Sequence, residues 1–599
     1  MDDATLSLLI LAAVVVLFVW NRLPVSAVAI LTALSLWATG LLSSTAVLAG
    51  FGDPVVIFIA TLFVVSEGID ATGVTAWVGQ QIVTRAGTQR SRLLVAIGLL
   101  CAVLTALITL NGSVAALLPL VVVLAMRIHE PPSQMLMPLA FAGSAGSLLM
   151  LTGSPVNVIV SEAAEEAGSR PFPFFSFALV GIPVLAGTVA ICVLLGPRVL
   201  PRTPPTDLPP DLARHAATLE QHYSLTDGLF RLRVREQSPL IGTLVEDIDL
   251  TAYPGVVVVG AQNPHRHSSL TSSLKADDVL VVGGPADQVS RLAIERLLAV
   301  TMDGSADSDA LLTPEAGAVE VVVPPRSSLV GQTVFPGMKR AYDLVVLAVQ
   351  RMGRDRGQRS TVVAEGDALL LHGSWAALDA LTRDRDVLVV DSPDVVRRQA
   401  LPWGPKASTA VLILLGMVVL LATGAVPPAI AGLLAATAMV LARVVGVQQA
   451  YRSVSWETVV LIGGLIPLST AIQTSGAADR ISSVIISAVG SGRPYLLLLA
   501  LFALTAVLGQ IVSNTATVLI VTPIAVSAAA ATHTSVRPVL MLIAVAGAAA
   551  LLTPIATPAN MMVMNPAGYR FGDYWKLGLP VMAWWLVVSV VVIPLIWKF

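Results

Sequence analysis

Long apolar runs fill both ends of this chain, whereas the middle is rich in charged residues. Residues 5–197 and 405–599 are mostly apolar, and 203–400 carry most of the charges. A membrane-spanning helix needs about 20 apolar residues. The first apolar part is therefore expected to form helices at 5–20, 24–43, 54–70, 135–164 and 174–197, and hairpin arms at 91–108 and 113–127. A mean hydropathy of +0.81 and a charged fraction of 12% agree with a polytopic α-helical membrane protein, since soluble domains average about 25% charged residues.

The two apolar parts repeat each other at a fixed spacing of 403 residues. The matching pairs are Asn111 and Asn514, Pro155 and Pro558, Asn157 and Asn560, Gly73 and Gly476, and Pro24 and Pro427. The hairpins at 91–127 and 494–532 are too short for two full crossings each, so they are predicted to be re-entrant. Five crossings per copy then remain, and this odd number inverts the second copy. Inverted repeats with broken helices are typical of transporters.

Basic residues predict the orientation of the chain. If the insert is cytoplasmic, most Lys and Arg residues of the short connecting segments lie on its side of the membrane, as expected. The connection at 162–172 on the opposite side is acidic instead, with Glu162, Glu165 and Glu166. We therefore expect a multi-pass protein of the cell (plasma or inner) membrane, with both termini outside and the insert cytoplasmic.

Polar breaks interrupt the apolar runs at corresponding places in the two copies. Unpaired backbone groups cost several kcal/mol each in hydrocarbon, and polar residues at that depth often mark a substrate path. Helix N-termini beyond such breaks attract anions, although the same residues could serve only as helix caps. The residues predicted to bind an anion are Asn111, Gly112, Ser113, Ser154, Pro155, Asn157, Ser513, Asn514, Thr515, Thr557, Pro558 and Asn560.

The second-half motifs Ser513-Asn514-Thr515 and Thr557-Pro558-Ala559-Asn560 resemble those of the divalent anion/sodium symporter (DASS) family, within the wider ion transporter superfamily. The resemblance covers both membrane halves. It implies an elevator mechanism, a homodimer, and import of sulfate or a dicarboxylate coupled to Na⁺. It also implies two Na⁺ sites, one at Asn111, Ser113 and Gly153 and one at Ser513, Asn514, Thr515 and Ala556. The first tip departs from the family pattern, because it reads Leu110-Asn111-Gly112.

The insert contains a second duplication, with a spacing of 89 residues. Ser238–Gly242 corresponds to Ser327–Gly331, and Asp278–Gly283 corresponds to Asp367–His372. Runs of β-branched residues followed by helical patterns predict two tandem α+β domains. They resemble RCK C-terminal (TrkA-C type) domains, which implies cytosolic regulation by a small ligand; a scaffold that binds nothing is the alternative. The predicted bounds are 1–200 for the first membrane repeat, 201–220 for a Pro-rich linker, 221–305 and 306–395 for the two domains, and 396–599 for the second membrane repeat.

These patterns favour a secondary active transporter that imports a small divalent oxyanion. The alternatives are arsenite-type oxyanion efflux, a carrier coupled to H⁺, and a channel or anion sensor controlled by the insert. Glu67 and Asp70 could carry protons, but capping or pairing at the membrane interface is their favoured role. The sequence shows no nucleophile–base pair, metal cluster or dinucleotide motif. We therefore expect neither an enzyme nor an organic cofactor, and no nucleic-acid partner.

Overall fold

A computed structural model describes most of the chain and divides it into two compact units. One unit contains Met1–Pro210 and Lys406–Phe599, and the other contains Asp211–Pro405. Most of the linker predicted at 201–220 lies outside the described residues. The description leaves out residues 1, 21, 76, 79–80, 82–88, 204–218, 220–222, 224–228, 251, 254–255, 263–272, 284–285, 301–311, 313–315, 336–337, 339–343, 357–359, 394–395, 397–402, 405 and 490–492.

The first membrane half is a series of helices with a break near its middle. Its elements are α1 (Asp3–Trp20), α2 (Val25–Ala38), α3 (Ser44–Ala49), η1 (Gly50–Gly52), α4 (Pro54–Ala71), α6 (Arg90–Leu107), α7 (Leu110–Arg127), η2 (Pro132–Gln134), α8 (Leu136–Gly146), η3 (Leu151–Gly153), α9 (Pro155–Glu166) and α10 (Ala178–Val199). Asp53 is the N-cap residue of α4, because its carboxylate accepts the N–H of Val55 at 2.8 Å.

The second membrane half has the same order of long helices, short helices and breaks. Its elements are α15 (Ala407–Thr423), α16 (Pro428–Leu441), α17 (Val447–Ser453), α18 (Trp456–Thr474), α19 (Ala477–Val489), α20 (Pro494–Leu508), α21 (Asn514–Ala531), α22 (Val536–Ala548), η9 (Pro554–Ala556), α23 (Pro558–Met564), η10 (Phe571–Asp573) and α24 (Tyr574–Ile596). Each half thus contains one helix pair, α6–α7 or α20–α21, followed by a helix that is interrupted, α8–α9 or α22–α23.

The helical prediction is confirmed at this level, with one difference in length. Within the described residues, seven helices are long and apolar enough to cross a membrane. The arm predicted at 113–127 begins earlier, at Leu110, so α6 and α7 have 18 residues each. An 18-residue helix is about 27 Å long, which is close to the thickness of the hydrocarbon core. The re-entrant path and the inverted relation of the halves therefore stay predictions.

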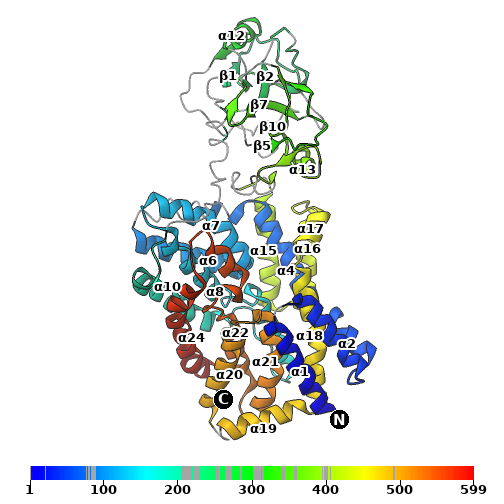
Figure 1. Ribbon diagram of the computed structural model, residues 1–599, viewed down its shortest axis with the longest axis vertical. Coiled ribbons are helices and arrows are strands. Elements are labelled where there is room, and N and C mark those ends of the chain that lie inside the picture. The colour runs from blue at the N-terminus through cyan, green and yellow to red at the C-terminus, as the bar shows by residue number, and fades with distance from the viewer. Residues whose placement is uncertain are drawn as a thin grey trace. The chain divides into compact units, whose positions relative to one another are not determined.

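The helices of this unit pack as two bundles, each built from both halves of the chain (Figure 1). We call bundle A the set α1, α2, α4 and α15–α18, in which α4 packs on α16 and α2 packs on α18. Bundle B is the set α6–α10 and α20–α24, in which α9 packs on α21 and α22, and α10 packs on α24. The bundles meet where α18 contacts α21 and where α4 contacts α9.

Among the described residues, the two larger sheets of the other unit are antiparallel and have corresponding strand orders. The first sheet has the order β2-β3-β1-β4, with β1 (Leu229–Val234), β2 (Val257–Gln262), β3 (Val279–Gly283) and β4 (Leu298–Val300), and α12 (Ala286–Glu295) follows β3. The corresponding part of the second sheet has the order β7-β10-β5-β11, with β5 (Ala316–Val322), β7 (Val345–Arg351), β10 (Ala368–Ser374) and β11 (Leu388–Val389), and α13 (Trp375–Leu381) follows β10. The second domain also has β8 (Arg354–Asp355), β6 (Thr333–Val334) and β9 (Thr361–Val362).

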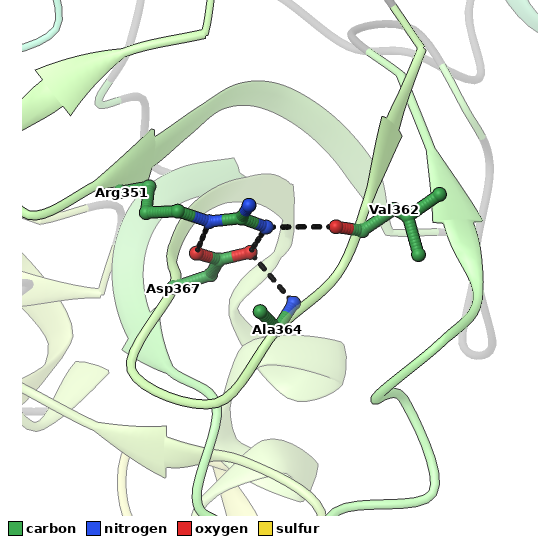
Figure 2. A network of polar contacts seen from close by, with 4 residues as sticks. All are labelled: Arg351, Val362, Ala364 and Asp367. Atoms are coloured by element: carbon green, nitrogen blue, oxygen red, sulfur yellow. Dashed lines mark hydrogen bonds and ion pairs between the residues drawn. The ribbon is translucent and has the colours of Figure 1, made fainter.

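One ion pair distinguishes the second sheet from the first. The Asp367 carboxylate accepts hydrogen bonds from Arg351 Nε at 2.7 Å, Arg351 Nη2 at 2.8 Å and the Ala364 N–H at 2.8 Å, and Arg351 Nη2 also donates to the Val362 carbonyl (Figure 2). Asp278, 89 residues earlier, accepts the corresponding N–H of Lys275 at 2.8 Å. The residue 89 positions before Arg351 is Gln262, so the first domain has no arginine at this place.

Candidate functional site

The polar breaks of both membrane halves lie along one cavity of about 350 Å³. The first half contributes Asn111 from the start of α7, and Gly153, Ser154 and Pro155 from the break before α9. The second half contributes Ser513, Asn514, Thr515, Ala556 and Pro558. Residues that are about 400 positions apart in the sequence therefore line the same space, as the duplicated pattern predicts.

Among the described residues, four helices of 12 residues or more begin at this cavity with a hydroxyl side chain as their N-cap. These are α7, α9, α18 and α21, with the capping residues Thr109, Ser154, Ser455 and Ser513. The N–H groups of a first helical turn lack partners within the helix, and the helix dipole places partial positive charge there. Among the described residues that line the cavity, none is Lys, Arg or His, and Glu457 is the single acid. Any anion held here would thus rely on helix N-termini and on co-bound cations.

The two helix breaks are held open by the same hydrogen bonds. Asn157 Nδ2 donates to the carbonyl oxygens of Ser147 at 2.7 Å and Met150 at 2.8 Å. In the second half, Asn560 Nδ2 donates to Ala550 at 2.9 Å and Thr553 at 3.1 Å. The donor and both acceptors of the second half each lie 403 residues after their counterparts in the first half. Both asparagines are fully buried, so each satisfies carbonyl groups that the broken helix leaves without partners.

The first break also requires a glycine. A Cβ atom on Gly153 would lie 2.4 Å from the Ser147 carbonyl oxygen, which is a severe clash. Gly153 lets the chain fold back onto the end of α8 while its own backbone faces the cavity. Gly153, which is predicted to be a Na⁺ ligand, is therefore also a position with no room for a side chain.

The first hairpin tip uses its polar groups internally. Thr109 Oγ1 accepts the Gly112 N–H at 3.2 Å, and Ser113 Oγ donates to the Thr109 carbonyl at 2.8 Å. Ser113 is fully buried. The groups that cap α7 are thus already occupied, and Asn111 is the polar side chain that this tip presents to the cavity.

The second hairpin tip leaves its polar groups available. Ser513 is the N-cap residue of α21, yet its side chain makes no capping hydrogen bond. The buried oxygens Asn514 Oδ1 and Thr517 Oγ1 also have no hydrogen-bond partner. Buried polar atoms are nearly always paired. Asn514 lines the cavity at the N-terminus of α21, so its unpaired oxygen has the character of a ligand atom, and oxygen is the donor that a hard cation such as Na⁺ prefers.

Gln510 ties the second hairpin to its neighbouring break. Its Nε2 donates to the carbonyls of Ala506 and Ala549, both at 2.9 Å, and its Oε1 accepts the Leu552 N–H at 2.8 Å. The corresponding residue in the first half is Leu107. There, Thr152 Oγ1 donates to the Ala106 carbonyl at 3.1 Å. The second tip is accordingly held by more hydrogen bonds than the first.

Several residues predicted from the sequence do not line the cavity. These are Gly112, Ser113, Asn157, Thr557 and Asn560. Each has a local backbone role instead; Thr557 Oγ1, for example, accepts the Asn560 N–H at 3.2 Å and caps α23. Glu67 and Asp70, for which capping or pairing is the favoured role and proton transfer the alternative, do not line the cavity. They accept hydrogen bonds from Gln449 Nε2 at 2.7 Å and Thr75 Oγ1 at 3.0 Å.

Sequence reasoning missed the start of α18. Ser455, Glu457 and Thr458 line the cavity on the side of bundle A. At a spacing of 403 residues, Ser455 and Glu457 correspond to Gly52 and Pro54, so the duplication gave no signal. An acidic residue directly after a serine cap at the start of an apolar run was the available clue.

Comparison with known proteins is consistent with this architecture. The family described as citrate transporter (CitMHS) matches residues 15–532 and 472–599. The chain belongs to this family. It is 31% identical over 603 residues to the uncharacterized transporter YfbS of Escherichia coli K12, covering 98% of both chains. It is 25% identical to sodium/sulfate cotransporter 1 of Chlamydomonas reinhardtii, covering 60% of this chain and 42% of that protein. The structure of the YdaH transporter of Alcanivorax borkumensis aligns over 97% of this chain and 98% of that chain, with a TM-score of 0.46 and 14% identity.

Family membership establishes a multi-pass membrane transporter and confirms that the chain is not an enzyme. The sequence resemblance to DASS transporters is confirmed in part, since the matching family belongs to the same ion transporter superfamily. The comparisons carry no information on the RCK-like domains of the insert. An anion is the substrate class that the family implies.

Proposed function

We propose that this chain is a secondary active transporter that imports a small divalent oxyanion, sulfate or a dicarboxylate, together with Na⁺. The observation that carries the proposal is the cavity on which four helix N-termini and both hairpin tips converge without a cationic side chain among the described lining residues. A divalent anion needs compensating charge. In this site, the helix dipoles and co-bound Na⁺ would supply it.

Two kinds of comparison support the choice of substrates. The family is described as citrate transporters, and one relative is a sodium/sulfate cotransporter. Both names describe small oxyanions with at least two negative charges. The better-formed Na⁺ site in our proposal is the second tip, with Ser513, Asn514 and Thr515 and the backbone at Ala556. Asn111, Ser113 and Gly153 form the weaker one, where Ser113 acts through its backbone because its hydroxyl is already bonded to Thr109.

The proposed mechanism is of the elevator type. Bundle B contains both hairpins and both broken helices, whereas bundle A supplies one wall of the cavity through α4 and α18. Movement of bundle B against bundle A would carry the site across the membrane. Dimerisation, the cytoplasmic position of the insert, its regulatory role and the outward position of both termini belong to the same proposal.

Uptake by proteoliposomes tests this function. Labelled sulfate, a dicarboxylate and citrate would be offered separately, with and without an inward Na⁺ gradient. We expect accumulation of one of these anions above its external concentration, driven by Na⁺ and absent from protein-free liposomes. Flux that only follows the anion gradient would instead identify a channel, and accumulation driven by H⁺ alone would refute Na⁺ coupling.

A further inference from the structure

A second cavity of about 340 Å³ is lined by α4, α9, α18 and α21, four helices that also line the first cavity. Its acidic wall consists of Asp53 at the start of α4 and Glu162 and Glu166 on α9. Its opposite wall is polar but uncharged, with Ser469, Thr470 and Gln473 of α18 and Thr522 of α21. The two helices that contribute carboxylates belong to different bundles, because α4 is part of bundle A and α9 is part of bundle B.

The position of this cavity connects it to the proposed transport site. On α9, Pro155 lines the first cavity and Glu162 lines the second, and on α21 the corresponding pair is Asn514 and Thr522. Seven or eight residues along a helix correspond to about 10–12 Å. The second cavity therefore lies about two helical turns beyond the hairpin tip, at the boundary along which the bundles would move.

Two carboxyl groups from different bundles line this cavity, Asp53 from the start of α4 and Glu162 from α9. Two carboxylates that share one site repel each other, so a proton on one of them is favoured. The other ionisable groups that act on Glu162 are the carboxylates of Glu165 and Glu166, and the α18 and α21 side chains that line the cavity are uncharged. None of the described residues that line the cavity is Lys, Arg or His.

An independent feature of the opposite wall also indicates a polar occupant. Thr522 is 5% exposed, and its Oγ1 has no hydrogen-bond partner although the residue lines the cavity. A buried hydroxyl without a partner is unusual. A water molecule that donates to Thr522 and accepts from the protonated carboxyl pair would satisfy it and would form a proton path into the cavity.

We propose that Asp53 and Glu162 form a proton-binding site that joins the two bundles. The shared proton makes the contact between α4 and α9 attractive. Loss of that proton leaves two facing carboxylates that repel each other, and the bundles separate there. Proton binding would thus be linked to the position of bundle B. The coupling role rests on the proposed carrier function, whereas proton binding by the pair does not.

Infrared titration of the purified full-length protein tests proton binding without any substrate. We expect wild type to show the band of a protonated carboxyl group at neutral pH and to lose it at alkaline pH. Asp53→Asn and Glu162→Gln should each remove this band. In Glu162→Gln, the glutamine amide can still donate to Asp53, so this variant should keep the fold. Glu165→Gln is the matched control, because Glu165 is exposed on the same helix and does not line the cavity; it should keep the band.

The pH profile of uptake then tests the link to transport. Wild-type uptake should change with pH across the range in which the band titrates. In Glu162→Gln, the ratio of uptake at acidic and alkaline pH should fall towards one, whereas Glu165→Gln should follow wild type. A wild-type protein without the band at neutral pH, or a band that survives in both cavity variants, would overturn the proton site. An unchanged pH profile in Glu162→Gln would overturn the coupling alone.

Discussion

The two hairpin tips occupy corresponding positions in the sequence, but they face the cavity with different chemistry. At a spacing of 403 residues, Leu110, Gly112 and Val114 of the first tip correspond to Ser513, Thr515 and Thr517 of the second. The first tip thus lacks three hydroxyls that the second tip has, and its cap, Thr109, is bonded to its own backbone. The second tip has unpaired oxygens on Asn514 and Thr517.

The difference separates the geometry of the site from its ligands. The asparagines behind the tips, Asn157 and Asn560, make matching pairs of hydrogen bonds in both halves. Both halves therefore have the broken helix and its dipole. Of the two tips, only the second has buried side-chain oxygens without a hydrogen-bond partner among the described residues, so in our proposal the two sites contribute unequally to transport.

The largest expected effect comes from removing the amide of the second tip. Asn514→Ala deletes the unpaired Oδ1, and a lost interaction with a charged ligand costs about 3 kcal/mol, or about a hundredfold in uptake. The corresponding change in the first tip, Asn111→Ala, should reduce uptake only about tenfold. Initial rates at several Na⁺ concentrations would measure both. Equal losses in the two variants would contradict the asymmetry of the tips.

The anchor of the second hairpin gives the next largest effect. Gln510→Leu introduces the residue type found at the corresponding Leu107, and it removes two hydrogen bonds between the hairpin and the break and one within the hairpin. We expect a loss of about 3 kcal/mol in the free energy of unfolding, because buried backbone groups are left unpaired. Thr152→Val in the first half removes one bond and should cost about 1 kcal/mol. Thermal unfolding in detergent would compare them.

Asn157 and Asn560 test whether a residue supports the break or binds substrate. Either Asn→Ala variant should lower the free energy of unfolding by about 2 kcal/mol, since two carbonyl groups lose their donors. The affinity of correctly folded molecules for the anion should change little, because neither side chain reaches the cavity. Thermal unfolding and equilibrium binding of the labelled anion separate the two readouts. A large drop in affinity with normal stability would restore the direct binding role predicted from the sequence.

The sequence predicted the helices, the breaks and the polar residues at these breaks because these features repeat. Pro155, Pro558 and the paired asparagines mark interruptions that composition alone would not explain. The roles of Asn157, Ser113 and Thr557 could not be predicted, since a polar residue that satisfies broken backbone looks the same in sequence as one that faces a ligand. The pairing of Asp53 with Glu162 was also hidden, because it joins positions in different bundles that no local pattern connects.

The insert shows the same kind of asymmetry with a smaller expected effect. Burial raises the pKa of Asp367, but hydrogen bonds from Arg351 and Ala364 and the charge of the guanidinium lower it overall. Arg351→Gln, which introduces the residue type at the corresponding position 262, should destabilise the sheet that contains β7 and β10, because it removes both hydrogen bonds from the guanidinium to Asp367. A carboxyl group with a lowered folded-state pKa stabilises at a pH above its ordinary value near 4, and this contribution is lost as the pH falls through the lowered pKa. The wild-type advantage over the variant should therefore be present at neutral pH and disappear in acid.

Limited proteolysis of the full-length chain at both pH values would measure this difference, with Gln262→Ala as the control in the first sheet. An equal difference at both pH values would show that Arg351 acts through packing rather than through the charge of Asp367.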